Sequence, residues 1–76
     1  MTVKQLMNTA NVTPDVTISI VGRLDACSPI EEIYYGRYES TSEAIQNMEV
    51  DRFRVTHLRE LEYRTDIDRM IIYINN

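Results

Sequence analysis

The chain has 76 residues, of which 43% are hydrophobic and 26% charged, and its formal net charge is −4. A chain of this length has room for one domain, which we expect to span residues 1–76. The normal apolar fraction excludes an intrinsically disordered composition, and no stretch approaches the roughly 20 apolar residues of a membrane span.

The first predicted element is a helix at the start of the chain. Apolar residues recur at the spacing of one helix face, at Val3, Leu6, Met7 and Ala10. Thr2 and Gln5 form a capping box, in which each side chain accepts a hydrogen bond from the other residue's backbone N–H. Asn11 and Pro14 end the helix, because the residue before a proline is pushed toward extended geometry.

A strand is predicted over residues 15–21, where apolar and polar residues alternate. The alternation places Val16, Ile18 and Ile20 on one face. Gly22 breaks this run. Residues 23–29 are predicted to form a loop, because they include the turn-forming residues Asp25, Ser28 and Pro29.

A second strand is predicted over about 32–39, with two different faces. Alternation places Ile33, Tyr35 and Arg37 on one face, and Tyr34, Gly36 and Tyr38 on the other. The glycine inside this strand indicates a bulge or a close approach of the backbone. Two consecutive strands joined by a loop of moderate length most simply pair antiparallel.

A short helix is predicted next, over about 41–48. Ser40 would cap it and Glu43 would complete the capping box. Its apolar side would bury Ala44, Ile45 and Met48.

The last third of the chain is predicted to form a long hairpin. In the run 50–63, one parity holds Phe53, Val55, His57, Leu61 and Tyr63, and the other holds Arg52, Arg54 and Thr56. A turn around Thr65 and Asp66 leads into residues 70–74, which are apolar on both faces like a central strand. The order α-β-β-α-β-β predicts an α+β fold, a small antiparallel sheet of about four strands with two short helices packed on it.

No residue pattern predicts catalysis, a metal site or a bound cofactor. The parity of His57 with Phe53 favours a packed or interface histidine over a catalytic base. Cys27 is the only cysteine, and Asp25 beside it disfavours a nucleophilic thiolate. The sequence contains three acidic pairs, Glu31/Glu32, Glu60/Glu62 and Asp66/Asp68. We expect their carboxylates to be solvated at the surface. The alternative is that they are metal ligands or acid–base dyads. We therefore expect a protein that is not an enzyme.

Arginine and tyrosine supply the candidate binding residues, Tyr34, Tyr35, Tyr38, Arg37, Arg52 and Arg54. Two arginines at strand spacing project from the same face and could hold a phosphate or a carboxylate-rich partner. The alternative is that these arginines pair locally with Glu49, Asp51 and Glu60. The tyrosines either form a binding surface, as Tyr and Arg often do, or one of each pair packs under a helix.

Several segments together resemble short accessory proteins of phages and prophages of Gram-positive bacteria. The matching segments are Thr2–Leu6, Val16–Ile20, Tyr35–Arg37, 50–58 and Met70–Ile74. The loop 23–29 is longer than is usual in that group. The resemblance implies no enzymatic residues. It implies an accessory gene of a mobile element, whose products include inhibitors of host defence such as anti-CRISPR proteins.

The resemblance leads us to expect a phage protein that binds and inhibits a host defence effector in the bacterial cytoplasm. The alternative is an oligomeric protein that binds or sequesters a nucleotide signal, with Tyr34 or Tyr35 stacked on the base and Arg52 and Arg54 on phosphates. The excess of acidic residues argues against direct binding of nucleic acid. A thin core at this chain length also favours a homo-oligomer.

Overall fold

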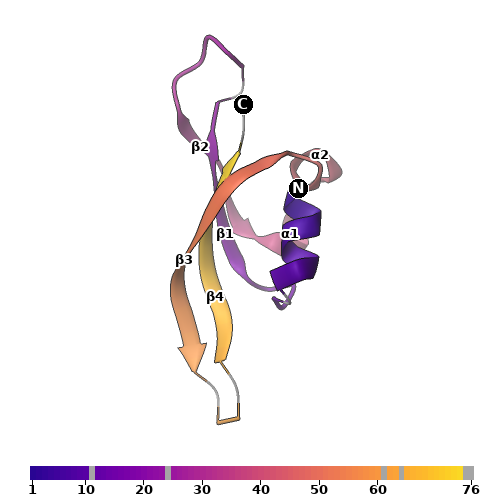
Figure 1. Cartoon of the computed structure of the whole chain (residues 1–76), viewed down its shortest axis with the longest axis vertical. Helices are drawn as coiled ribbons and strands as arrows, with labels where there is room; N and C mark the ends of the chain where they lie inside the picture. Colours follow the sequence, from indigo (N-terminus) through magenta and orange to yellow (C-terminus); the bar gives the residue numbers. More distant parts are fainter. Residues whose placement is uncertain (11, 24, 61, 64, 75–76) are drawn as a thin grey trace.

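A four-stranded sheet with a helix packed on one face forms the centre of the computed structural model (Figure 1). The structure describes residues 1–10, 12–23, 25–60, 62–63 and 65–74. The α+β class is confirmed. The elements in chain order are helix α1 (Val3–Ala10), strands β1 (Thr17–Gly22) and β2 (Glu31–Arg37), the 3-10 turn η1 (Tyr38–Ser40), helix α2 (Glu43–Gln46), and strands β3 (Val50–Glu60) and β4 (Thr65–Ile74).

The strand order in the sheet is β2-β1-β4-β3. β1 pairs antiparallel with β2, and β3 with β4, as expected of consecutive strands. The two central strands β1 and β4, however, run parallel, with Thr17 opposite Arg69 and Val21 opposite Tyr73. The expectation of a purely antiparallel sheet is therefore wrong for the central pair.

The connection between β2 and β3 explains this parallel pair. After β2 the chain passes through η1 and α2 and enters β3 at the opposite edge of the sheet (Figure 1). β3 then runs in the same direction as β2, so β4 runs in the direction of β1. Crossovers of this kind are what bring two strands into parallel pairing.

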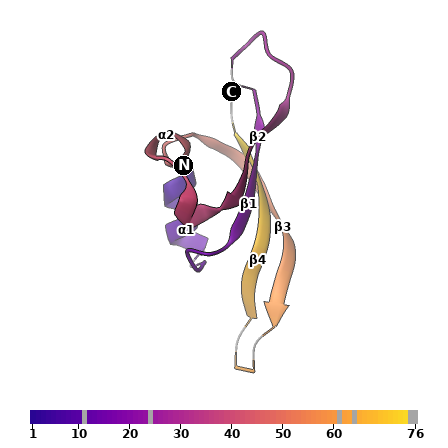
Figure 2. The ribbon, with the colours of Figure 1, turned by 180° about the vertical axis from the view of Figure 1, so that it is seen from behind.

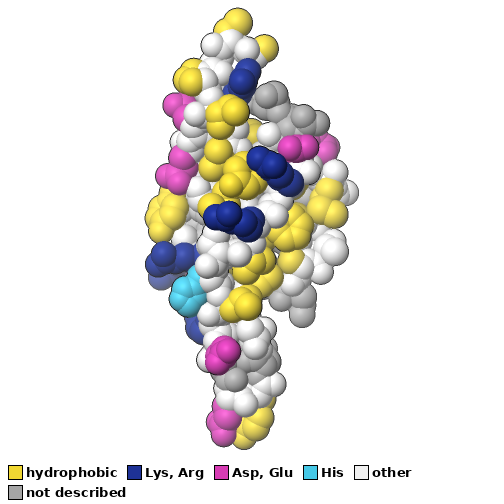
Figure 3. Space-filling model, turned by 60° about the vertical axis from the view of Figure 1, so that its left-hand side comes forward, with side chains coloured by type: hydrophobic (Ala, Val, Ile, Leu, Met, Phe, Trp, Pro, Cys, Tyr) yellow, Lys and Arg dark blue, Asp and Glu magenta, His cyan; other side chains and the backbone are white. Residues whose placement is uncertain are grey.

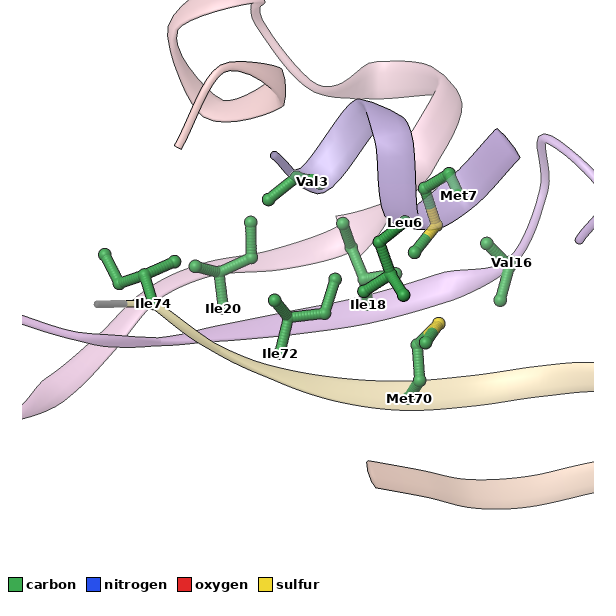
Figure 4. Packing of buried hydrophobic residues seen from close by; sticks show 9 residues of the cluster. All are labelled: Val3, Leu6, Met7, Val16, Ile18, Ile20, Met70, Ile72 and Ile74. Carbon is green, nitrogen blue, oxygen red and sulfur yellow. The ribbon is translucent and has the colours of Figure 1, made fainter. Parts of the chain in front are cut away.

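The hydrophobic core lies between α1 and the two central strands (Figure 4). The predicted helical stripe and strand alternation are confirmed, except that Ala10 is only half-buried. Each fully buried side chain of this kind contributes about 1.5–3 kcal/mol. The core residues are Val3, Leu6 and Met7 of α1, Val16, Ile18 and Ile20 in and before β1, and Met70, Ile72 and Ile74 of β4.

The start of α1 is fixed by the predicted capping box and by the segment before β3. Gln5 N–H donates to Thr2 Oγ1 at 3.2 Å, and Thr2 N–H donates to Gln5 Oε1 at 2.8 Å. Val3 N–H also donates to the Met48 carbonyl at 3.0 Å. These bonds hold α1 against the sheet at its N-terminus. Asn11, expected to help end the helix, lies outside the described residues.

β2 carries a bulge that changes the predicted faces. Ile20 is opposite Tyr34 but Val21 is opposite Glu32, so Ile33 is an extra residue on β2. Ile33 consequently packs against the core together with Tyr34, and the expectation that it shares a face with Tyr35 is wrong.

The close approach predicted at Gly36 is present. The ring of Tyr34 lies over this glycine, whose φ is +157°, and a Cβ added there would stand 2.9 Å from the Tyr34 hydroxyl oxygen. That hydroxyl donates to the Arg37 carbonyl at 2.8 Å. Tyr38, predicted at the end of this strand, lies instead in η1.

The second helix is shorter than predicted and begins later. Ser42, not Ser40, caps α2, and its hydroxyl oxygen accepts from Ile45 N–H at 3.4 Å. Ser40 ends η1, so it is unavailable as a cap. Ile45 packs against the core as predicted, whereas Ala44 is exposed. The single turn is too short to bury both sides.

The β3–β4 hairpin is longer than the sheet that supports it. β1 pairs with β4 only over Arg69–Tyr73, so the rest of the hairpin extends beyond the sheet as a two-stranded ribbon (Figures 1 and 2). The predicted turn at Thr65 and Asp66 is wrong, because both residues begin β4 and pair with Glu60 and Arg59. The predicted strand to residue 63 ends at Glu60, and Leu61 lies outside the described residues.

A second bulge leaves His57 outside the core, so the prediction of a packed histidine is wrong, and that of an interface histidine stays a prediction. Val55 is opposite Met70 and His57 is opposite Arg69, so Thr56 is an extra residue and the alternation shifts. The His57 side chain is consequently 56% exposed.

Because the core lies on one side of the sheet, truncating a buried and an exposed isoleucine to alanine should change the free energy of unfolding by different amounts. Ile18→Ala removes a fully buried side chain and should cost about 2–5 kcal/mol of unfolding free energy. Ile30→Ala changes a side chain that is 64% exposed and should stay within about 0.5 kcal/mol. Urea unfolding of both variants measures the difference, and equal losses would contradict the assigned core.

We predict that position 22 requires glycine, because the side chain of Ile74 occupies the space that a larger residue would need. An added Cβ at this position would stand 2.2 Å from Ile74 Cγ1, so Gly22→Ala should destabilise the fold by about 1–3 kcal/mol. Truncating Ile74 to Ala in the same chain removes the clashing atom. The double variant should therefore lose less than the sum of the single losses in denaturant unfolding, whereas strictly additive losses would show that the two side chains do not meet.

Candidate functional site

The sheet has one covered and one uncovered face. Figures 1 and 2 agree that both helices lie on the same side of the sheet. On the other side, no described helix packs against β1 or β4. Side chains that alternate with the core residues of these strands therefore face outward. We call this surface the open face.

Strand register arranges the open face in three rows that cross the sheet from β2 toward β3. Neighbouring rows are two residues apart along a strand, a separation of roughly 7 Å. Row one holds Arg37, Thr17, Arg69 and His57; row two holds Tyr35, Ser19, Ile71 and Arg54; row three holds Glu32, Val21, Tyr73 and Arg52.

Most arginines of the open face form no ion pair with a carboxylate of the described residues. The Arg52 guanidinium lies 4.7 Å from the centroid of the Tyr73 ring, a cation–π contact. In the described part of the chain no ion pair joins Arg52, Arg54 or Arg69 to a carboxylate. The alternative of local pairing with Glu49 does not hold, because that carboxylate accepts from the N-terminal ammonium at 3.0 Å. Positive charge thus gathers on one face of an acidic chain.

Figure 3 shows the distribution of charge on this face. Dark-blue Lys and Arg side chains cross the middle of the molecule among yellow hydrophobic side chains, and magenta acidic side chains lie on both sides of them and toward the lower end. Arg37 differs from the other arginines of the face, because its Nη1 lies 3.4 Å from Glu39 Oε1.

The predicted binding residues divide between the two faces. Arg37, Arg52, Arg54 and Tyr35 lie on the open face, and the Tyr35 side chain is 60% exposed. Tyr34 and Tyr38 pack against the core cluster on the covered side. The alternative in which one tyrosine of a pair packs under a helix therefore describes Tyr34 and Tyr35.

Sequence reasoning missed the contribution of β4 to this surface. Arg69, Ile71 and Tyr73 alternate with the buried residues of β4 and so belong to the open face. The alternation was visible in the sequence, but their position beside β1 was not, because an antiparallel sheet was expected.

Of the remaining candidate residues, His57 lies on β3 opposite Arg69, Asp66 and Asp68 lie where β4 extends beyond the sheet, and Cys27 lies in the loop before β2. His57 Nδ1 is 3.9 Å from Asp68 Oδ2, and Arg59 lies 3.8 Å from Asp66 and 3.9 Å from Asp68. The Arg59 guanidinium thus lies beside both carboxylates of the pair Asp66/Asp68 and offsets part of their charge. Cys27 is an exposed free thiol. Within the described ranges, no three His, Cys, Asp or Glu side chains gather in a group that could hold a metal ion.

Two carboxylates have altered proton affinity, and both lie in turns. The hydroxyl of Thr13 donates to Asp15 and lowers the pKa of that carboxyl. Cys27 N–H donates to Asp25 Oδ1 at 2.8 Å, which together with Ser28 lowers the pKa of Asp25. These bonds organise the turns before and after β1 and supply no acid or base to the open face.

Comparison of the chain with protein-family models, with curated proteins and with solved structures found no match. Among the described residues, no helix is long and apolar enough to cross a membrane.

Proposed function

We propose that this chain is a non-enzymatic binding protein that docks onto an acidic surface of a protein partner. The contact would be made by an arginine pair, Arg52 and Arg54 on β3, supported by the Tyr73 ring. The observation that carries the proposal is that Arg52 and Arg54, on a sheet face that no described helix covers, form no ion pair with any carboxylate of the described residues.

The chemistry of the pair fits a protein surface rich in carboxylates. A guanidinium presents parallel N–H donors that match a carboxylate in two hydrogen bonds. Stacking on Tyr73 holds Arg52 in one orientation, which reduces the conformational freedom lost on binding. Arginine and tyrosine are also the residues that most often dominate binding energy at protein interfaces.

The resemblance to phage accessory proteins supplies the setting for this contact. In that setting the partner is a host defence effector in the bacterial cytoplasm, and the chain inhibits it by occupying an acidic functional surface. The remaining negative charge of the chain disfavours competing contacts with nucleic acid. Self-association of the chain is a separate prediction, measured by its mass in solution.

Reversal of the arginine pair should abolish inhibition. Wild type expressed in bacteria carrying the targeted defence system should raise phage plating, and R52E/R54E should remove this protection and weaken capture of the effector by at least about tenfold. The loss follows from placing carboxylates opposite an acidic partner. K4E provides the control, because Lys4 is an exposed cation on α1, on the covered side of the sheet.

Two measurements complete this test. Circular dichroism melting must show that R52E/R54E folds like wild type, and R52K/R54K should retain part of the affinity because it keeps the charge without the planar donors. Protection and effector capture by R52E/R54E at the wild-type level would overturn the proposal. Failure of wild type to protect against any defence system of its host would do the same.

A further inference from the structure

A shallow hollow of about 310 Å³ opens on the open face, on the β2 side of the arginine pair. Its volume is at the lower end of the range of small-ligand sites, about 300–1,000 Å³. The lining combines an aromatic ring, an aliphatic side chain, hydroxyls and charges of both signs. The lining residues used below are Ser19, Glu32, Tyr35, Thr56, Arg69 and Ile71.

The middle of the hollow lies between two larger side chains, and we call the space between them the slot. Tyr35 and Ile71 both lie opposite Ser19, one on each side of β1. Neighbouring strands are about 4.8 Å apart, so these two larger side chains stand roughly 10 Å apart with a small serine between them. The exposed Tyr35 ring offers a stacking surface and Ile71 an apolar contact, which together suit a planar heterocycle.

One end of the hollow is basic. In row one, Arg69 lies beside Thr17, about 7 Å along the strands from the slot. Arg37, on the other side of Thr17, does not line the hollow and pairs with Glu39. Arg69 is exposed and makes no ion pair with a carboxylate in the described part of the chain. Its guanidinium and the nearby hydroxyl of Thr56 are donors of the kind that bind a phosphate.

The floor of the slot is acidic, because the Glu32 carboxylate is held against Ser19. Ser19 Oγ donates to Glu32 Oε2 at 2.6 Å, which fixes the carboxylate there. The rest of the carboxylate can accept hydrogen bonds from an amino group on a heterocycle. The hollow therefore has a cation at one end and a carboxylate on the floor of its stacking slot. A nucleotide combines a phosphate with a flat ring whose edge can carry an amino group.

We propose that this hollow binds a free nucleoside 5′-monophosphate whose base carries an amino group. The base lies between Tyr35 and Ile71, its amino group donates to Glu32, and the phosphate accepts from Arg69. Arg52 and Arg54 are not needed for this binding. The nucleotide site is therefore separate from the protein-docking pair, and the two proposals can be tested independently.

Calorimetric titration of the whole chain with AMP, GMP, CMP and UMP tests the site. At least one of the three amino-bearing nucleotides should bind about tenfold tighter than UMP, inorganic phosphate or the matching nucleoside. R69Q and Y35A should each weaken that binding by about tenfold or more. K4Q removes a cation from α1 and Y63A removes a tyrosine that is 90% exposed on the ribbon, so both should bind like wild type.

The controls distinguish the possible failures. Thermal melting shows whether R69Q and Y35A remain folded, which is expected because both side chains are exposed. Equal binding of UMP and the amino-bearing nucleotides, no binding by wild type, or wild-type affinity in both R69Q and Y35A would overturn the proposal. Binding of a single-stranded oligonucleotide without binding of any mononucleotide would overturn it too. None of these outcomes changes the R52E/R54E result, which tests the protein contact alone.

Discussion

The packing of α1 on the central strands is the constraint from which the rest of the structure follows. Alternate residues of β1 and β4 face this helix and are almost completely removed from water. One helix of 8 residues supplies enough apolar surface for one side of the sheet only. The second helix has a single turn and packs at the margin of the core. In the part of the chain that the structure describes, no helix covers the other side of the sheet.

An uncovered sheet face must be stable in water, and the composition of the open face shows how this is achieved. Small hydroxyl residues, Thr17 and Ser19, occupy its centre on β1, and charged side chains flank them on the outer strands. Antiparallel sheets often carry polar residues on a solvated face. Here Arg52, Arg54 and Arg69 form no ion pair with a carboxylate of the described residues, and the Tyr73 ring adds aromatic surface, so the face carries more hydrogen-bond donors than its carboxylates neutralise. That excess is the physical basis for assigning a binding role.

Local pattern was sufficient to predict the elements that build the core. The stripe Val3, Leu6 and Met7 and the alternation around Ile18 lie where the periodicity placed them. The capping box of α1 was also correct. These features depend on residues close together in the sequence, so local propensity and burial agree.

The structural features that could not be predicted from the sequence depend on pairing between distant strands or on bulges. The parallel contact of β1 with β4 joins opposite ends of the chain, and nothing in either strand specifies its direction. Extra residues at Ile33 and Thr56 shift the alternation, which moved Ile33 toward the core and left His57 exposed. The candidate site was therefore predicted in part. Arg52, Arg54 and Tyr35 were found, whereas Arg69, Ile71 and Tyr73 required knowledge of the neighbouring strand.

The most direct test of the one-sided sheet is solvent accessibility measured by NMR with a soluble paramagnetic agent at a protein concentration where the chain is monomeric. The account predicts strong broadening of the Ile71 methyl and Tyr35 ring signals, because both face water. The signals of Ile72 and Ile18, which lie under α1, should remain sharp. Equal protection of Ile71 and Ile72 in the monomer would show that both faces are covered, and would contradict the account.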